Sequence, residues 1–556
     1  MTTRRDMLRQ LTLTSLALSP LGAGLRTAQA MSPRPLREQP LRADLIIIGG
    51  GTGGCAAALA ACSRGLRVIM TEESAWIGGQ LTAQAVPPDE NKWIETMGGT
   101  RSYRELRSAV RDHYRTDPRL LARARGNPRL NPGNGWVSRL CAEPRVWLAA
   151  IEAQLAPHIA SGQLRVLRHT RAVAADVERD VVRAVRVRQA DDSELLLEAP
   201  YVVDATELGS LSALVGAELV TGAESRRMTG EPHAAEDAQP DNQQSFTVVF
   251  AMEYRPGEQH VIERPADYAR WRSDTVDVNG TMWPLLGFDE PANKRIGFDP
   301  DKRSGYWSYR RIIDHTLFTP GTHVGDVTLV NWWQNDYHHG PLVGVTEREA
   351  AAQIQAAGSL SLSLLYWLQT EAPRPDGGRG WPGLKLRSDI VGTDNGLAMT
   401  PYIRESRRLL TRRTLREQDV LRSLLPPGTE TTAFPDSVGI GHYAMDLHRT
   451  TRGDSGGYGD TVPFQIPLGA LIPVRVRNLL PACKNFGVTH LTNGCYRLHP
   501  IEWNVGEAVG HLVAHALQTR RAPDAIYANA TRTADYQREL QQAGIGLTWP
   551  TPLPAE

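Results

Sequence analysis

The sequence predicts an α/β fold in which a β-rich domain interrupts a domain built on a parallel sheet. Residues 43–48 form a short, continuous apolar segment, which is typical of a strand buried on both faces. An alanine-rich, helix-prone segment at 55–64 and a second apolar strand at 66–70 follow, so strand, helix and strand alternate. A helix expected at 501–517 completes this part, whereas residues 236–460 are rich in Trp, Tyr, His and Asn and are expected to form the inserted domain.

The composition is that of an ordinary globular protein and excludes several classes. The chain has 556 residues, 41% hydrophobic and 22% charged, and that length suggests two or three domains. Its 62 Lys and Arg against 61 Asp and Glu give a net charge of +1, so the chain lacks the basic excess of a nucleic-acid binder. Its five cysteines are too few for a disulfide framework. After the N-terminal segment, no apolar stretch is long enough to span a membrane, so no stable membrane insertion is expected.

The first thirty residues have the layout of a secretory signal. Arg4 and Arg5 precede an apolar stretch at 11–25, and Ala28-Gln29-Ala30 is a small-x-small cleavage site. The paired arginines resemble a twin-arginine signal, with an ordinary secretory signal as the alternative. We therefore expect export of the folded protein by the twin-arginine machinery, to the periplasm or the outside of the cell, followed by a linker at 31–42.

A glycine-rich turn joins the first strand to its helix with the pattern G-x-G-x-x-G. The first glycine permits a tight turn, the second lets the backbone approach a pyrophosphate, and the third lets helix and strand pack closely. The helix N-terminus presents free N–H groups to phosphates. Glu72 ends the second strand 23 positions after Gly49, where a carboxylate can bond ribose hydroxyls and would repel a 2′-phosphate, which argues against NADP. A purely structural turn is the alternative reading. The cofactor-binding residues expected here are Gly49, Gly51, Thr52, Gly53, Gly54 and Glu72.

Three later segments resemble parts of two-dinucleotide-binding flavoproteins, and they favour FAD over NAD, which the glycine pattern alone leaves open. The turn at 73–80 resembles the segment that runs beside the FAD pyrophosphate, and 201–209 resembles a D-A-T-G-D-G turn, with Glu207 in place of Gly. The last helix resembles the one whose N-terminus faces the flavin ring, where its dipole stabilises negative charge. Strands are expected at 164–167, 172–177, 181–197 as a hairpin pair, 201–204 and 472–483, and a loop is expected at 489–494. The residues assigned to the cofactor by these resemblances are Glu73, Gly78, Gly79, Gln80, Asp204, Ala205, Thr206, Asn493, Pro500 and Asn504.

Together with the segments 98–103, 400–408 and 472–510, these motifs resemble the FAD-dependent oxidoreductase family that includes heterodisulfide-reductase-A-like flavoproteins, some of which are labelled xanthan lyase. The resemblance covers most of residues 43–520 and implies FAD as cofactor, in a two-dinucleotide-binding, glutathione-reductase-like FAD domain with an inserted cap. Several relatives hold an iron–sulfur cluster, but this chain has no C-x₂-C-x₂-C run. The expected divisions are a signal at 1–30, a linker at 31–42, the FAD-binding domain at 43–235 and 461–520, a substrate or cap domain at 236–460, and a helical tail at 521–556.

The inserted domain is expected to hold the substrate, because no second G-x-G-x-x-G that could bind NAD occurs between residues 210 and 470. Its aromatic and amide side chains suit a carbohydrate or another polyhydroxylated ligand, and an aromatic sheet core is the alternative. His338 and His339 are adjacent, and adjacent residues of a strand point in opposite directions, so no metal site is expected.

Catalysis would need a base beside the flavin. His490 and His499 flank the expected ring-facing loop and are the candidates, and Arg497 could stabilise reduced flavin or a substrate carboxylate. Tyr402 and Arg404, with Arg407, could face the same pocket. The leading function is an exported FAD-dependent dehydrogenase or oxidase that transfers a hydride from a small polar substrate to flavin N5, a sugar derivative being one option, with an electron acceptor that the sequence does not identify. The alternatives are a flavin-containing lyase or isomerase without net redox change, and a non-catalytic carbohydrate-binding protein.

Overall fold

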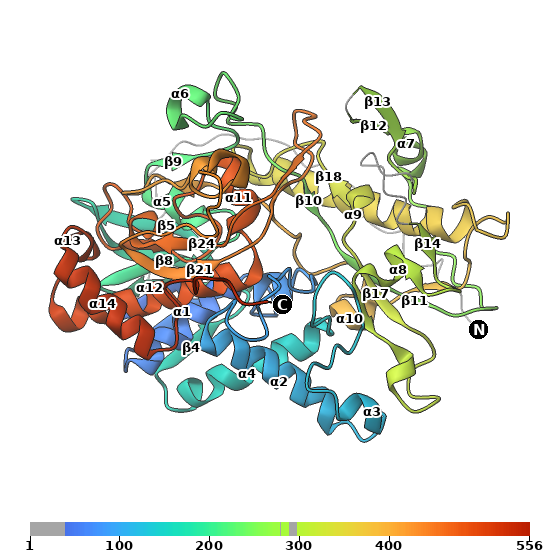
Figure 1. The fold of residues 1–556 in the computed structure, drawn as a ribbon, viewed down its shortest axis with the longest axis horizontal. Coiled ribbons are helices and arrows are strands. Elements are labelled where there is room, and N and C mark those ends of the chain that lie inside the picture. Colours follow the sequence, from blue (N-terminus) through green and yellow to red (C-terminus); the bar gives the residue numbers. More distant parts are fainter. Residues whose placement is uncertain (1–38, 279, 289–296, 556) are drawn as a thin grey trace, which may run out of the picture. The chain divides into compact units, whose positions relative to one another are not determined.

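Five parallel strands form the central sheet, in the order β25-β8-β2-β3-β4. Two of them, β8 and β4, are labelled in Figure 1. All four pairings are parallel, and every residue of β2 is buried, as the continuous apolar segment predicts. The predicted α/β class with a parallel sheet is therefore confirmed. The strands are β2 (Leu45–Ile48), β3 (Val68–Thr71), β4 (Leu164–Leu167), β8 (Tyr201–Asp204) and β25 (Leu479–Pro481).

The structure is a computed structural model that describes residues 39–278, 280–288 and 297–555. The expected signal at 1–30 lies outside these residues, as does most of the expected linker at 31–42. The end of that linker is a strand, β1 (Leu41–Arg42), which pairs in parallel with β7 (Glu194–Glu198). The hairpin of β6 (Val181–Arg188) and β7 leaves one edge of β7 free, and the incoming chain covers it.

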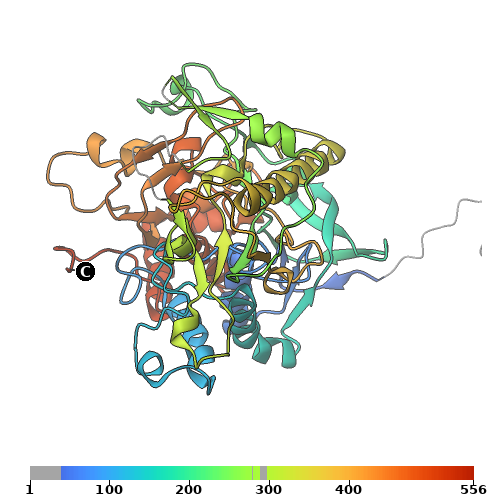
Figure 2. The ribbon, with the colours of Figure 1, turned by 90° about the vertical axis from the view of Figure 1, so that its right-hand side faces the viewer.

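The predicted hairpin belongs to a second sheet, with the order β1-β7-β6-β5, drawn in blue and teal at the right of Figure 2. The strand β5 (Arg171–Glu178) pairs with β6 in antiparallel fashion. Apolar residues such as Val185 and Leu197 pack this sheet against one face of the central sheet, which contributes Ile46 and Val202. After β7 the chain returns to the central sheet as β8 and then forms α5 (Ser210–Val215), β9 (Leu219–Val220) and α6 (Arg226–Thr229).

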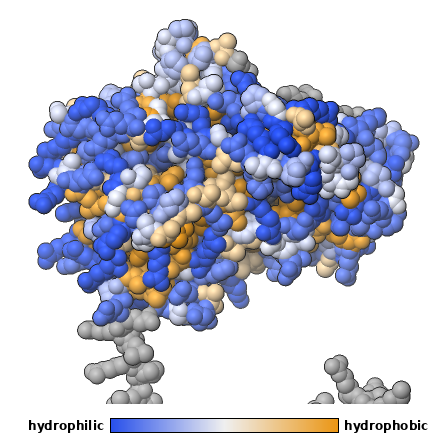
Figure 3. Space-filling view, turned by 90° about the horizontal axis from the view of Figure 1, so that it is seen from below, coloured by the Kyte–Doolittle hydropathy of each residue, from blue (hydrophilic) through white to orange (hydrophobic). Residues whose placement is uncertain are grey.

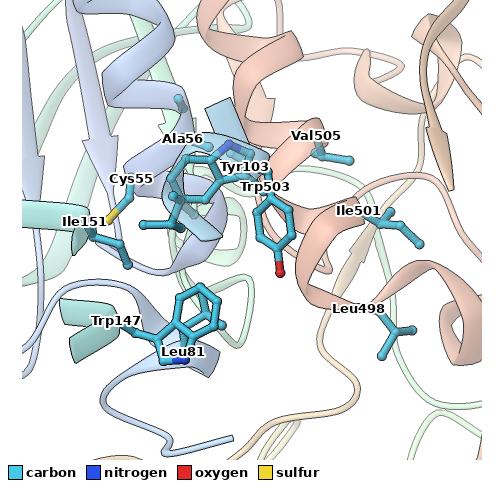
Figure 4. Close-up of a cluster of buried hydrophobic side chains, with 14 of the residues drawn as sticks. Cys55, Ala56, Leu81, Tyr103, Trp147, Ile151, Leu498, Ile501, Trp503 and Val505 are labelled. Carbon is cyan, nitrogen blue, oxygen red and sulfur yellow. The ribbon is translucent and has the colours of Figure 1, made fainter. Parts of the chain in front are cut away.

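The helices α1 (Thr52–Ser63) and α12 (His499–Thr519) pack against each other along most of their length, because glycines remove the side chains between them. A Cβ added to Gly506 would lie 2.1 Å from the Gly53 carbonyl oxygen, and one on Gly510 would lie 2.4 Å from the Ala57 carbonyl oxygen. Trp503 of α12 donates to the Ser102 hydroxyl at 2.7 Å. Figure 4 shows side chains of α1, α12, α4 (Pro144–Ala160) and α2 (Arg101–Thr116) together in this core. The short helix α3 (Ala122–Arg125) follows α2 in the chain.

Residues 246–403 hold a second hydrophobic core. It lies between the antiparallel sheet β16-β17-β11-β19 and the 24-residue helix α9 (Glu347–Thr370), which begins at a capping box of Thr346 and Glu349. Aromatic residues are numerous in this core, and Trp307 and Tyr337 belong to it, as the alternative of an aromatic core proposed for these two residues. The elements are β10 (Phe246–Thr247), β11 (Phe250–Tyr254), α7 (Tyr268–Ser273), β12 (Thr275–Val278), β13 (Thr281–Pro284), β14 (Phe298–Asp299), β15 (Ser304–Gly305), α8 (Tyr306–Tyr309), β16 (Arg311–Ile313), β17 (Val327–Val330), β18 (Asp336–Tyr337), β19 (Leu384–Leu386) and α10 (Ser388–Val391).

The C-terminal part returns the chain to the central sheet. The expected loop at 489–494 is wrong: α11 (His490–Tyr496) occupies it, because the Thr489 hydroxyl accepts from the Thr492 amide and caps a helix there. The remaining elements are β20 (Arg408–Leu409), β21 (Ser437–Gly441), β22 (Met445–Leu447), β23 (Gly457–Gly459), β24 (Phe464–Pro467), α13 (Pro523–Tyr527) and α14 (Ala530–Gln542).

One face of the molecule shows hydrophobic residues interspersed among hydrophilic ones (Figure 3). Among the described residues, no helix is both long and apolar enough to cross a membrane.

Candidate functional site

A cavity of about 310 Å³ lies at the carboxyl ends of β2, β3 and β8, where open α/β sheets bind their ligands. We call it the sheet-end cavity. The segments that follow these strands form one wall, and residues 399–403 with Leu342 and with Ile354 of α9 form the other. Its lining residues are Gly49, Gly51, Glu72, Glu73, Gly79, Ala83, Gln84, Ala205, Thr206, Glu207, Leu208, Ser210, Leu342, Ile354, Met399, Thr400, Pro401 and Ile403.

Each glycine of the pattern G-x-G-x-x-G is found there for a different geometric reason. Gly49 has a φ of 103°, and a Cβ there would lie 2.2 Å from the Ala205 carbonyl oxygen. A Cβ on Gly54 would lie 2.1 Å from the Gly49 carbonyl oxygen, so this glycine allows helix and strand to pack closely. At Gly51 the nearest atom to an added Cβ is Oε1 of Glu207, at 3.0 Å. The space above Gly51 is therefore bounded by a side chain, whereas the spaces above Gly49 and Gly54 are closed by backbone.

Glu72 lies at the end of β3 with both carboxylate oxygens engaged. Oε2 accepts from the Gly50 amide at 3.1 Å, and Oε1 accepts from the amide and hydroxyl of Ser74 at 2.8 and 2.7 Å. Burial raises the pKa of Glu72 to about 7. Both lone pairs of Oε1 are used by Ser74, but Oε2 keeps one, so the fixed carboxylate can still accept a hydrogen bond from a ligand in the cavity.

A buried ion cluster adjoins the glycine turn and was not expected from the sequence, except that Glu207 departs from the usual glycine. The Lys484 ammonium is fully buried, donates to Glu207 and lies 3.4 Å from Oε2 of Glu502. Glu502 also accepts from the Gly53 amide at 3.1 Å and from Gln80. Burial opposes the charge on Lys484, but Cys483 and the two carboxylates outweigh it and raise its pKa well above the usual value. The ammonium thus offsets part of the negative charge of Glu207 and Glu502, which would otherwise repel a phosphate more strongly.

A second cavity, of about 200 Å³, lies beside the first, and we call it the arginine cavity. The segments 83–89 and 399–404 contribute residues to both cavities and are joined where the Thr400 amide donates to the Ala83 carbonyl at 3.2 Å. Tyr402 lines the arginine cavity, while its neighbours Pro401 and Ile403 line the other. The residues of the arginine cavity are Asp89, Trp136, Tyr306, Tyr309, Arg310, Asn331, Trp332, Trp333, Tyr402, Arg404, Tyr443, Asp446, His448 and Arg497.

Arg497 and Arg404, both singled out in the sequence, line this second cavity and are almost fully buried. Arg497 donates to the Tyr402 hydroxyl at 2.7 Å and lies 3.3 Å from the Asp446 carboxylate. Arg404 donates to the Asp336 carboxylate at 2.8 Å. Both guanidinium groups are therefore fixed in place before any ligand arrives.

His448 is the histidine that lines the arginine cavity, and sequence reasoning missed it. Its Nδ1 lies 2.6 Å from Oδ2 of Asp336, and its Nε2 lies 3.2 Å from Oδ2 of Asp446. The partner Asp336 is 112 positions away in the chain, so no local spacing marks His448 as special. It also lines a neighbouring cavity of about 270 Å³ that contains His490.

His490 and His499, the two expected bases, lie elsewhere than expected. His490 is on α11, with Nδ1 2.9 Å from Glu405 and its amide donating to Glu224 at 2.9 Å. Burial opposes its protonation, but Glu405 outweighs burial and raises the pKa of His490. Nδ1 of His499 accepts from the Asp89 amide at 3.1 Å, and burial lowers the pKa of this histidine well below its usual value. Neither residue lines the sheet-end or the arginine cavity, because α11 and α12 carry both into the protein interior.

The remaining predicted residues divide into three groups. Seven of them line the sheet-end cavity: Gly49, Gly51, Glu72, Glu73, Gly79, Ala205 and Thr206. Thr52, Gly53 and Gly54 begin helix α1, and Gly78 and Gln80 lie in the segment beside it, where the Thr52 hydroxyl donates to the Gly78 carbonyl at 3.0 Å. Asp204, Asn493, Pro500 and Asn504 are buried and do not line that cavity. Asp204 holds its own turn by accepting from Thr206 and Ser212, and Asn504 bonds the backbone of β21.

Two adjacent histidines contradict the expectation that they point in opposite directions. The ring centroids of His338 and His339 lie 4.5 Å apart, because β18 ends at Tyr337 and the alternation of a strand no longer applies. His339 lies 2.9 Å from Asp274 and packs on Trp271, so it has a structural partner.

The sheet-end cavity fits a flavin dinucleotide. The space above Gly51 is bounded by the carboxylate of Glu207 and not by backbone, so a movement of that side chain would admit a phosphate. Glu72 is fixed at the end of β3, and Lys484 offsets part of the negative charge of Glu207 and Glu502. Gln84 lines the cavity and is buried, and both atoms of its amide lack a hydrogen-bond partner. An amide offers both a donor and an acceptor, which matches the edge of a flavin ring.

Comparison with known proteins agrees with this geometry. Residues 44–540 match the model of a family described as FAD dependent oxidoreductase. An 81-residue segment is 32% identical to an NADH oxidase of Thermoanaerobacter brockii; it covers 14% of this chain and 12% of that protein.

Solved structures give weaker likenesses. An anhydrotetracycline hydroxylase, OxyS, from Streptomyces rimosus matches at 13% identity and a TM-score of 0.32, over 91% of this chain and 67% of its own. The glycerol-3-phosphate dehydrogenase from Bacillus halodurans, complexed with FAD, matches at 12% identity and a TM-score of 0.21, over 39% of this chain and 40% of its own. These likenesses are too distant to define what this chain acts on.

Proposed function

Because the chain belongs to the FAD-dependent oxidoreductase family, whose cofactor is FAD, we propose that it oxidises a small polar substrate bound in the arginine cavity. The adjacency of two cavities that share the segments 83–89 and 399–404 carries this proposal. When bound, FAD supplies a two-electron acceptor that takes a hydride at N5. If FAD binds in the sheet-end cavity, the glycine turn, Glu72 and Gln84 would hold it there.

The residues of the arginine cavity can manage the proton that such an oxidation releases. His448 lies between two carboxylates, with Nδ1 2.6 Å from Asp336 and Nε2 3.2 Å from Asp446. If Asp336 holds the imidazole proton on Nδ1 and a substrate hydroxyl takes the place of Asp446 at Nε2, Nε2 can accept the proton of that hydroxyl. Arg497 is fixed by Tyr402 and Asp446 and can orient an oxygen of the substrate. The walls also contain Trp332 and Trp333, whose apolar faces can pack on a sugar ring.

We further propose that the protein is exported through the twin-arginine machinery and works in the periplasm or outside the cell. Arg4-Arg5, the apolar stretch and the small-x-small site support this proposal. An electron acceptor must then reoxidise the flavin. A lyase or isomerase without net redox change, and a non-catalytic carbohydrate-binding protein, are less favoured, because family membership points to redox chemistry.

Anaerobic mixing tests the proposal. Purified holoprotein is mixed with sugars, sugar acids, hydroxy acids and amines while the visible absorption of oxidised flavin is recorded. Bleaching by one class of compound, lost in His448→Gln but not in His499→Gln, is the expected result. Product formation without bleaching would support the lyase or isomerase instead.

A further inference from the structure

We infer that the substrate carries a carboxylate, and that Arg310 in the arginine cavity selects it. This inference rests on the proposed function, because it names the substrate class of the same cavity. Arg310 lies at the start of the segment that leads into β16, and it was not marked by any motif in the sequence.

The Arg310 guanidinium is buried with weak partners. Arg310 is only 6% exposed, yet the hydrogen bonds from its guanidinium to the Pro87 carbonyl and the Tyr309 hydroxyl are 3.5 and 3.4 Å long. The nearest carboxylate oxygen, Oδ1 of Asp89, lies 3.6 Å away, and Nε has no partner. A buried charge is stable only when it is paired and hydrogen-bonded, so this geometry leaves room for an anion.

Arg404, in the same cavity, has short hydrogen bonds at both terminal nitrogens of its guanidinium, although its Nε has no partner. Its two terminal nitrogens make four hydrogen bonds of 2.8 to 3.2 Å, one of them to Asp336. Arg497 likewise has Asp446 as a partner. Among the three arginines of the cavity, Arg310 therefore has the least compensated positive charge.

The unpaired polar atoms of the cavity are mostly donors. Six residues that line it each have a buried N–H group without a partner, whereas one buried acceptor, Oδ1 of Asp89, lacks a donor. A neutral polyol donates and accepts in equal measure, but a carboxylate only accepts, and its planar pair of oxygens matches the guanidinium fork. The unpaired donors are Nε of Arg310, Arg404 and Arg497, Nδ2 of Asn331, and Nε1 of Trp332 and Trp333.

The charged groups and unpaired polar atoms of the arginine cavity together favour a monoanion that also bears a hydroxyl group. Asp89 and Asp446 line the same cavity and would repel a doubly charged phosphate, while Oδ1 of Asp89 can accept from a substrate hydroxyl. A hydroxy acid, including a sugar acid, meets both requirements. In its oxidation the C–H hydride carries two electrons to FAD, the hydroxyl proton goes to His448, and the alcohol carbon becomes a carbonyl.

Binding can be measured apart from redox chemistry, because Trp136, Trp332 and Trp333 line the cavity and report occupancy by their fluorescence. The FAD-loaded protein is titrated with matched pairs, glucuronate against glucose and lactate against lactamide, and with inorganic phosphate. The carboxylate of at least one pair is expected to bind at least about tenfold more tightly than its neutral partner. Arg310→Gln should remove that preference and Arg310→Lys should restore part of it, while the exposed-residue control Arg379→Gln should retain it.

Equal affinity for acid and neutral partners, tighter binding of phosphate, or an unchanged preference in a folded, FAD-loaded Arg310→Gln protein would each overturn the inference. If carboxylates bind through Arg310 but no compound bleaches the flavin, the proposed oxidation fails and the carboxylate site stands. If a neutral sugar bleaches the flavin equally well in wild type and Arg310→Gln, the oxidation stands and the carboxylate site fails.

Discussion

Oδ2 of Asp336 lies 2.6 Å from Nδ1 of His448, and the other oxygen of the same carboxylate accepts from Arg404 at 2.8 Å. Asp336 is buried, and burial by itself would favour its neutral form, but Arg404 and His448 outweigh burial and hold its pKa well below the usual range. An ionised Asp336 thus fixes the orientation of the one histidine side chain that lines the arginine cavity in the described residues.

Replacing Asp336 by Asn should therefore impair proton transfer more than binding. An amide can present its N–H group to Nδ1 and place the imidazole proton on the wrong nitrogen, so we expect kcat to fall by about 10²–10⁴ with little change in KM. Steady-state kinetics over a range of pH values measures this effect. A rise in KM of similar size, with kcat unchanged, would assign Asp336 to substrate binding alone.

Replacement by alanine should have different effects at two neighbouring glycines, Gly53 and Gly51. A Cβ on Gly53 would lie 1.8 Å from the Ala482 carbonyl oxygen, so Gly53→Ala must displace backbone and should lower the unfolding temperature strongly. On Gly51 the nearest atom is the carboxylate tip of Glu207, which can move, so Gly51→Ala should fold. It should retain less than about one tenth of the bound FAD, because the methyl group blocks backbone approach to the pyrophosphate.

Thermal unfolding and the flavin content of both variants check this contrast. The account would be wrong about the turn if Gly51→Ala retained full FAD, or if Gly53→Ala were as stable as the wild type.

Lys484 should be essential to stability. Lys484→Met leaves Glu207 and Glu502 without their shared cation, and loss of one partner from a buried ion cluster costs about 3–5 kcal/mol of unfolding free energy. The double variant Lys484→Met/Glu207→Leu should recover part of that loss, since it removes one of the two unpaired carboxylates. Urea unfolding of the two variants provides the comparison, and an additive effect of Glu207→Leu would argue against the cluster.

The pair of Glu405 and His490 should make stability depend on pH in both directions. Burial raises the pKa of Glu405, but His490 and Arg408 outweigh it and lower this pKa to about 2. This contribution is present above the unfolded pKa of about 4.3 and is lost as the pH falls toward 2. The pKa of His490 is raised, so its contribution is present below the unfolded value of about 6.5 and is lost as the pH rises through the folded value.

Unfolding free energy measured between pH 5 and pH 9 tests the alkaline half of this dependence. The wild type should lose stability across this interval, and His490→Gln should lose less. An identical slope in both proteins would show that His490 does not bear the shifted pKa.

The sequence predicted the central sheet well, because its signals are local. Four apolar residues of β2 followed by a glycine turn and Glu72 define strand, turn and strand within thirty residues. The arginine cavity could not be predicted in the same way, since Arg310 and His448 acquire their neighbours from segments far apart in the chain. The histidines were misplaced for a related reason: Thr489 caps a helix where a loop was expected, and that helix points His490 toward Glu405.

The visible absorption spectrum of the native protein, before and after acid precipitation, tests the central claim most directly. The account predicts the bands of oxidised flavin in the native protein and FAD in the soluble fraction after precipitation, because the sheet-end cavity binds the cofactor through a glycine turn and fixed polar groups. A colourless protein that also fails to take up added FAD would contradict the account.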